Sequence, residues 1–139
     1  MRILLVDDNP GDARLIREAL REGHYHADID HVEDGVEAMH YLRHTSQYQA
    51  KSRPGLVLLD LNMPRKDGRE VLSEIKNDPE LKSIPVIILT TSDAESDISL
   101  CYQNHANCYL TKPVELDDFI KLAGLIHDFW LSAVKLPRH

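Results

Sequence analysis

The chain has 139 residues, of which 42% are hydrophobic and 28% charged, and it carries a formal net charge of −7. This length and composition predict one globular domain over residues 1–139, with no separate output domain, and exclude a disordered or fibrous chain. The Lys and Arg residues are scattered, which excludes the basic surface that nucleic acid binding needs. No apolar run approaches the roughly 18 residues of a membrane span, so membrane binding is excluded and a cytoplasmic location is expected.

Strands and helices are predicted to alternate along the chain. In chain order they are strand 3–6, helix 12–21, strand 28–32, helix 36–42, strand 56–59, helix 69–77, strand 86–89, helix 95–104, strand 108–110 and a helix from about 116 to 134. Three of the strands are continuous apolar runs, which is typical of parallel strands covered on both faces. The pattern predicts a doubly wound α/β fold with a five-stranded parallel sheet.

Three acidic residues come directly after two of these strands. Asp7 and Asp8 follow the first strand, and Asp60 follows the third. In the flavodoxin-like strand order 2-1-3-4-5 these two strands are neighbours, so the three carboxylates are expected to share one cleft at the carboxyl edge of the sheet. Like charges at that separation favour a bound cation, and oxygen ligands favour Mg²⁺. Simple capping of strand ends is the alternative for Asp7 and Asp8 alone.

Two hydrogen-bond donors reach the same edge from the other strands. Thr90 follows the fourth predicted strand, and Lys112 lies two residues beyond the fifth. A carboxylate can attack phosphorus as a nucleophile, and phosphoryl transfer mainly requires positioning and neutralisation of the phosphoryl oxygens. Mg²⁺, Lys112 and Thr90 could each hold one of these oxygens, so Asp60 is a candidate phosphoryl acceptor.

Four motifs in this order resemble the receiver domains of two-component response regulators. They are VDDN at 6–9, LLDLNMPRKDG at 58–68, PVIILTTS at 85–92 and YLTKP at 109–113, and each lies at the end of a predicted strand. The resemblance spans nearly the whole chain. It implies the flavodoxin-like receiver fold with the strand order 2-1-3-4-5.

The resemblance also implies roles for the residues around Asp60. Asp60 would be the phosphoacceptor, and both Asp60 and Asp8 would bind Mg²⁺ through their carboxylates. Asp7 would hold the ion through water, and Asn62 would contribute its backbone carbonyl. Gly68 would permit the turn that closes the loop after Asp60.

The donors on the far side of the cleft would form the switch. By resemblance, Thr90 is the switch hydroxyl, Tyr109 the aromatic switch residue, and Lys112 the cation that binds the phosphoryl group. The chain departs from the most frequent family pattern at Thr91, where a smaller residue is usual, and at His105, which replaces a common glycine. These two positions affect access to Asp60 and the loop before the fifth strand.

Partners follow from the same resemblance. A sensor histidine kinase would donate the phosphoryl group, and the output would be a contact with a downstream protein at the face formed by the fourth helix, fifth strand and fifth helix. The polar segment 44–54, predicted as a surface loop, ANCYLTKPVEL at 106–116 and FWLSAVKLP at 129–137 are similar to the small stand-alone regulators of cyanobacterial phytochromes. A phytochrome-type kinase is therefore the expected partner.

The last predicted helix carries more apolar residues than one core can cover. Residues 129–131 are consecutive and large, and at about 100° per residue they spread over roughly 200° of a helix. One inward stripe contains Phe119, Ala123, Ile126 and Trp130. The remaining apolar positions, Leu122, Leu125 and Phe129, form a second surface, for which we predict a homodimer contact. Packing of the whole helix against the core is the alternative.

Two other function classes use related folds. A phosphatase or phosphotransferase of the haloacid-dehalogenase type has DxDx[TV] after its first strand, whereas this chain has DDNPG at 7–11. A flavodoxin-like module for a nucleotide or flavin would need a phosphate-binding loop there, whereas Asp12 places an acid in that position.

Histidines and cysteines suggest further sites only weakly. His24 and His26 could share one face of an extended segment, but no Cys or acidic partner completes a zinc ligand set. Cys101 and Cys108 form neither a CxxC pair nor a ligand set, so two reduced, packed thiols are expected.

Overall fold

The apolar runs form a five-stranded parallel sheet in the computed structural model, which describes residues 2–22 and 27–137. The strands are β1 (Arg2–Val6), β2 (Asp28–Val32), β3 (Leu56–Leu59), β4 (Val86–Thr90) and β5 (Cys108–Thr111). The sheet order is β2-β1-β3-β4-β5, which confirms the predicted doubly wound topology. The predicted histidine pair, His24 and His26, lies outside the described residues.

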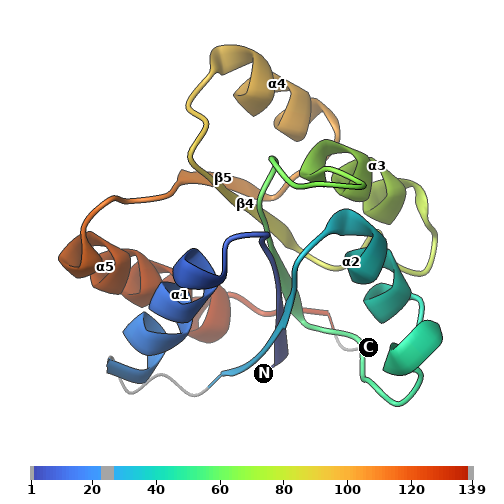
Figure 1. Cartoon of the computed structure of the whole chain (residues 1–139), viewed down its shortest axis with the longest axis horizontal. Helices are drawn as coiled ribbons and strands as arrows, with labels where there is room; N and C mark the ends of the chain where they lie inside the picture. Colours follow the sequence, from blue (N-terminus) through green and yellow to red (C-terminus); the bar gives the residue numbers. More distant parts are fainter. Residues whose placement is uncertain (1, 23–26, 138–139) are drawn as a thin grey trace.

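Helices cover both faces of the sheet (Figure 1). The α-helices are α1 (Pro10–Glu22), α2 (Gly35–Leu42), α3 (Gly68–Asn77), α4 (Glu95–Gln103) and α5 (Leu116–Ile126), with a 3₁₀ turn η1 (Ser46–Tyr48) and a π-helix η2 (His127–Ala133). One core lies under α1 and α5, and a second lies under α2 and α3. Because β1, β3 and β4 contribute alternate side chains to both cores, their long apolar runs are accounted for.

The loop after β3 folds back on its own strand. Asp67 caps α3 by accepting hydrogen bonds from the backbone N–H groups of Arg69 and Glu70 at 2.9 and 3.1 Å. The N–H of Gly68 donates to the carbonyl of Leu61 at 2.8 Å, and a Cβ at Gly68 would overlap the carbonyl oxygen of Asp60. Gly68 has no positive φ. It is therefore required for close backbone approach, and the expected role in permitting a turn is corrected to this one.

The sequence predicted one α-helix from about residue 116 to residue 134, and this prediction is wrong at the end of the chain. The α-helix ends at Ile126 and a π-helix follows to Ala133. The wider turn lets Trp130 and Leu131 both pack against the α1 and α5 core, whereas Phe129 stays outside this core and makes a T-shaped contact with Trp130.

The predicted inward stripe of the last helix is largely confirmed. Phe119, Ala123 and Ile126 are buried, and Trp130 is partly buried. Of the three residues predicted at a dimer contact, Leu125 and Phe129 are 66% and 56% exposed. Leu122 is partly buried and packs against the core, so it is not a free surface residue.

Cys101 and Cys108 are free thiols, as predicted, and belong to different cores. Within residues 2–22 and 27–137, no helix has both the length and the apolar character to cross a membrane.

Candidate functional site

The two central strands deliver acids to the same edge of the sheet. Val6 of β1 and Leu59 of β3 are partners in the parallel register, so the residues that follow them, Asp7 and Asp60, lie side by side. The ladder continues into both acids, because the N–H of Asp60 donates to Val6 at 2.9 Å and that of Asp7 donates to Val32 at 3.1 Å. Both side chains are buried, whereas Asp8 is exposed at the mouth of the site.

Carboxylate oxygens of Asp7, Asp8 and Asp60 all lie within 4.8 Å of one another. The structure thus brings together the three acids that the sequence predicted as a cluster. Asp7 Oδ2 is buried and, within the described part of the chain, has an ion-pair contact with Lys112 but no hydrogen bond of regular geometry. An under-satisfied buried oxygen in an all-oxygen set fits a hard divalent cation.

The ammonium of Lys112 lies at the centre of the acids. Its Nζ is 2.6 Å from Asp7 Oδ2 and 2.9 Å from both Asp12 Oδ2 and Asp60 Oδ2. The backbone N–H of Lys112 donates to the carbonyl of Thr90 at 2.7 Å, which fixes the residue against the end of β4. The ammonium thus donates hydrogen bonds to Asp12 and Asp60 and forms an ion pair with Asp7.

Charge and burial shift two pKa values in this cluster. Burial raises the pKa of Asp7 and outweighs the lowering by Lys112 and by the N–H of Asn9. Burial alone would lower the pKa of Lys112, but its contacts with Asp7, Asp12 and Asp60 raise it above the ordinary value. The lysine therefore stays protonated, and the cluster keeps more negative than positive charge.

Asp12 is a member of this cluster that the sequence analysis did not place there. It lies in the first turn of α1, directly beyond the loop that follows β1. From the sequence, Asp12 is only an acid that disfavours a phosphate-binding loop. Its position at the carboxyl edge of the sheet was the available signal, because helix starts that follow parallel strands lie at that edge.

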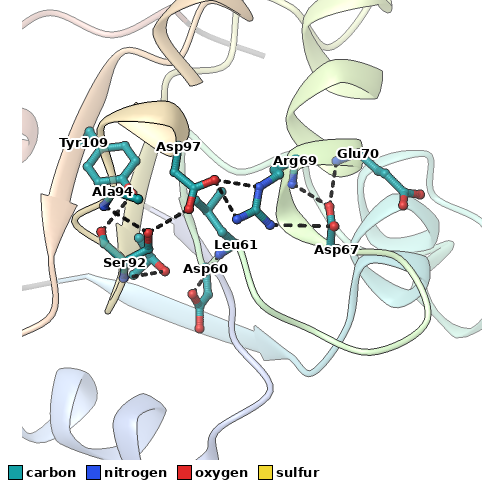
Figure 2. A network of polar contacts seen from close by, with 10 residues as sticks. Asp60, Leu61, Asp67, Arg69, Glu70, Ser92, Ala94, Asp97 and Tyr109 are labelled. Carbon is teal, nitrogen blue, oxygen red and sulfur yellow. Dashed lines mark hydrogen bonds and ion pairs between the residues drawn. The ribbon is translucent and has the colours of Figure 1, made fainter. Parts of the chain in front are cut away.

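The two expected switch residues both contact Ser92, in the loop between β4 and α4. Figure 2 shows Ser92 next to Tyr109. Thr90 is fully buried at the end of β4, and its Oγ1 lies 3.5 Å from the N–H of Ser92. The hydroxyl of Tyr109, from β5, donates to the carbonyl of Ser92 at 2.9 Å. Both residues thus contact one loop residue, although they come from different strands.

Other predicted site residues lie outside this cluster. Asn62 is exposed two residues after Asp60, and the metal-binding role of its carbonyl stays a prediction. The predicted dimer residues lie on α5 and η2, and not on the loops that carry the acids. His105 has a φ of 69°, in the left-handed region that favours glycine, as expected for a position where glycine is common.

Known proteins share both the sequence and the fold. Residues 3–123 match the response regulator receiver domain. The response regulator Rcp1 of Synechocystis is 48% identical over 135 residues, which cover 97% of this chain and 92% of that protein. The crystal structure of the phosphorylated cyanobacterial phytochrome response regulator RcpA aligns with a TM-score of 0.94 at 51% identity, covering 99% of this chain and 98% of RcpA. The Mn²⁺-bound form of Rcp1 aligns with a TM-score of 0.92 at 47% identity, covering 99% of each chain.

Proposed function

The chain belongs to the family of response regulator receiver domains, and on this premise we propose that Asp60 accepts a phosphoryl group from a sensor histidine kinase in the cytoplasm. Receiver domains are signalling switches and not classical enzymes. The protein would pass the signal to a downstream protein through a changed contact surface. One observation carries the proposal: Asp60 shares the carboxyl edge of the sheet with two further acids and the ammonium of Lys112.

The contacts of Asp60 support its role as nucleophile. Its Oδ1 accepts a hydrogen bond from the N–H of Leu61 at 2.7 Å, and its Oδ2 accepts one from Lys112 at 2.9 Å. These bonds fix the carboxylate for attack on phosphorus. A new bond would form between an Asp60 oxygen and phosphorus, and the bond from phosphorus to the kinase histidine nitrogen would break. Lys112 and the Thr90 hydroxyl would then donate to phosphoryl oxygens, with Tyr109 as the second switch residue.

The metal in this proposal is Mg²⁺. Asp8 and Asp60 would bind it through carboxylate oxygens, Asp7 through water and Asn62 through its backbone carbonyl. When bound, Mg²⁺ neutralises the carboxylates and the phosphoryl oxygens. The donor set of the described residues supports a hard divalent ion, and the similar protein Rcp1 has a Mn²⁺-bound form.

The kinase in this proposal is of the phytochrome type. The similar protein RcpA is a cyanobacterial phytochrome response regulator, and the similarity extends over nearly all of both chains. A phosphotransfer profile across purified histidine kinases tests this partner. We expect a phytochrome-type kinase to transfer its phosphoryl group to this protein faster than unrelated kinases do. If unrelated kinases transfer it as fast or faster, the assignment is contradicted.

Phosphorylation itself is tested with a small phosphodonor. Incubation with acetyl phosphate and Mg²⁺, followed by intact mass measurement, should add one phosphoryl group to the wild type and none to Asp60→Asn. Asp30→Asn is a matched control, because it removes a part-buried acid from β2, away from the cluster. Omission of the divalent ion should prevent the gain. Multiple turnover of an unrelated phosphoester would instead indicate a phosphatase, and no gain on the wild type would contradict the proposal.

We also propose a homodimer contact through α5 and η2. Leu125 and Phe129 are large apolar side chains that remain mostly exposed, and the partly buried Leu122 lies one turn before Leu125. A second copy of the chain would cover this surface by two-fold symmetry.

Sedimentation at micromolar concentration tests the dimer. We expect a dimer for the wild type and a monomer for Phe129→Ala. Val114→Ala is the control, because Val114 is also exposed and apolar but lies in the loop before α5. A monomeric wild type contradicts the dimer, and an equal loss of dimer in both variants contradicts the location of the contact.

A further inference from the structure

Ser92 joins the two expected switch residues to a polar network that reaches the start of α3 (Figure 2). Its N–H faces Thr90 Oγ1 at 3.5 Å and its carbonyl accepts the hydroxyl of Tyr109 at 2.9 Å. Its own hydroxyl donates to Asp97 Oδ2 at 2.7 Å. Asp97 therefore helps to fix the position of Ser92. Because Thr90 and Tyr109 both contact Ser92, a change in its position changes their contacts.

Asp97 is in turn held by an arginine from another helix. Arg69 donates from Nε and Nη2 to Asp97 Oδ1 at 3.0 and 2.7 Å, so the two oxygens of Asp97 serve different partners. Arg69 follows Gly68 in the first turn of α3, directly after the loop that closes on Asp60. A second acid, Asp67, lies 3.7 Å from Arg69 Nη1. Asp97 and Arg69 thus connect the loop after β3 with the loop after β4.

The pair is partly shielded from water. The side chains of Arg69 and Asp97 are 28% and 18% exposed. The hydrogen bonds from Ser92 and Arg69 lower the pKa of Asp97, so the carboxylate is charged at neutral pH. A part-buried Arg–carboxylate pair with several hydrogen bonds holds its geometry better than an exposed pair does.

We propose that Arg69 and Asp97 are positioning residues that set the switch equilibrium of the receiver by holding Ser92 against Thr90 and Tyr109. The inference rests on the proposed function, in which Thr90 and Tyr109 respond to phosphorylation. In this structure Asp60 is an unmodified carboxylate and Thr90 Oγ1 faces the N–H of Ser92 at 3.5 Å, so the contacts of Ser92 hold Thr90 in the geometry of the unmodified state. Movement of Thr90 toward a phosphoryl group would break its contact with Ser92 unless Ser92 moved as well, and movement of Ser92 would strain its hydrogen bond to Asp97.

Loss of the pair should therefore favour the switched state. The probe is beryllofluoride with Mg²⁺, which mimics a phosphoryl group on a carboxylate. We expect Asp97→Asn and Arg69→Met each to bind beryllofluoride about fivefold or more tightly than the wild type, the lower range of typical coupling between two sites. Mg²⁺ affinity measured alone should be unchanged, since neither residue contacts the acids of β1 and β3.

A double-mutant cycle and a matched pair make the test specific. The double variant should match either single variant, because both substitutions remove the same contact. Arg53→Met and Glu80→Gln are the controls, since Arg53 and Glu80 form another Arg–carboxylate pair, at 3.0 Å, outside the network. These controls should bind beryllofluoride as the wild type does.

The possible outcomes distinguish a failure of the proposed function from a failure of the inference about Arg69 and Asp97. No beryllofluoride binding by the wild type contradicts the proposed function, and the inference with it. If the wild type binds beryllofluoride and both Arg69→Met and Asp97→Asn bind it equally or more weakly, the inference alone is contradicted. A parallel change in Mg²⁺ affinity also contradicts it, because the pair would then act on the metal site and not on the switch.

Discussion

Two charged clusters on neighbouring strands of this sheet have opposite balances of charge. At the carboxyl end, the acid-rich cluster contains four carboxylates and one ammonium, from Asp7, Asp8, Asp12, Asp60 and Lys112. On β2, the Asp30 cluster contains a single carboxylate. Arg2 lies 2.8 Å and Lys51 3.6 Å from Asp30 Oδ2, and the hydroxyl of Tyr41 donates to the same oxygen.

The pKa values of the two clusters reflect this difference. Burial raises the pKa of Asp7, and the nearby charge of Asp60 adds to the effect. Burial alone would raise the pKa of Asp30 too, but hydrogen bonds from Tyr41 and Arg2 lower it below the usual value. The Asp30 cluster is thus satisfied by its own neighbours and holds β1, β2 and α2 together. The acid-rich cluster has one ammonium for four carboxylates, and this excess of negative charge is the state expected of a site that binds a cation.

The largest expected effect is the loss of the one cation in the acid-rich cluster. Lys112→Met leaves Asp7 and Asp60 buried without their partner, and removal of one member of a buried ion pair costs about 3 to 5 kcal/mol. We expect this drop in the free energy of unfolding in urea without divalent ions. Millimolar Mg²⁺ should restore part of it. A cost below about 1 kcal/mol would show that the acids are not electrostatically dependent on Lys112.

Removal of an acid from the same cluster should have the opposite sign. Asp7→Asn keeps the shape of the side chain and removes one of four like charges, so we expect it to raise the metal-free free energy of unfolding by about 1 to 2 kcal/mol, as substitutions that relax a functional site commonly do. The gain from added Mg²⁺ should be smaller than in the wild type. Destabilisation without metal would mean that the ion pair with Lys112 outweighs the repulsion.

Removal of Asp30 should destabilise the protein instead. Asp30→Asn loses the charge that Arg2 and Tyr41 hydrogen-bond, at a cost of about 1 to 2 kcal/mol near neutral pH. Because the folded-state pKa of Asp30 is lowered, its stabilisation is present above the unfolded pKa of about 4 and is lost as the pH falls through the folded value. The difference from the wild type should therefore shrink in urea titrations at decreasing pH. A difference that is independent of pH would point to packing and not to charge.

The three acids Asp7, Asp8 and Asp60 could be predicted as neighbours from the sequence, because the strand order fixes their positions. Once the strand order is known, residues that end β1 and β3 must be neighbours, whatever their side chains. The contact of Asp12 with Lys112 needed one further step, the position of the start of α1. The Asp30 cluster had no such signal, since it depends on the register of β1 and β2 and on the reach of Tyr41 and Lys51.

The end of the chain was less predictable for a related reason. Apolar periodicity predicted one α-helix through residues 129–131. That pattern does not show which of these side chains contact the core, and in the structure Trp130 and Leu131 both do. The π-helix η2 satisfies those contacts at the cost of regular geometry. Where neighbouring strands constrained a residue, the sequence pattern was enough. At the end of the chain, where no neighbouring strand fixes the position, contacts with the α1 and α5 core decided the outcome.

The smallest expected effect concerns the second cation of the Asp30 cluster. The side chain of Lys51 is 45% exposed and its Nζ lies 3.6 Å from Asp30 Oδ2, whereas Arg2 keeps the shorter contact. Exposed pairs contribute about 0.2 to 1 kcal/mol, so Lys51→Met should lower the free energy of unfolding by a few tenths of a kcal/mol. The change should vanish at about 1 M salt, where charges beyond about 3 Å are screened. A loss above 1 kcal/mol that persists in salt would mean that Lys51 anchors the loop after α2 through packing, and that the Asp30 cluster depends on that loop.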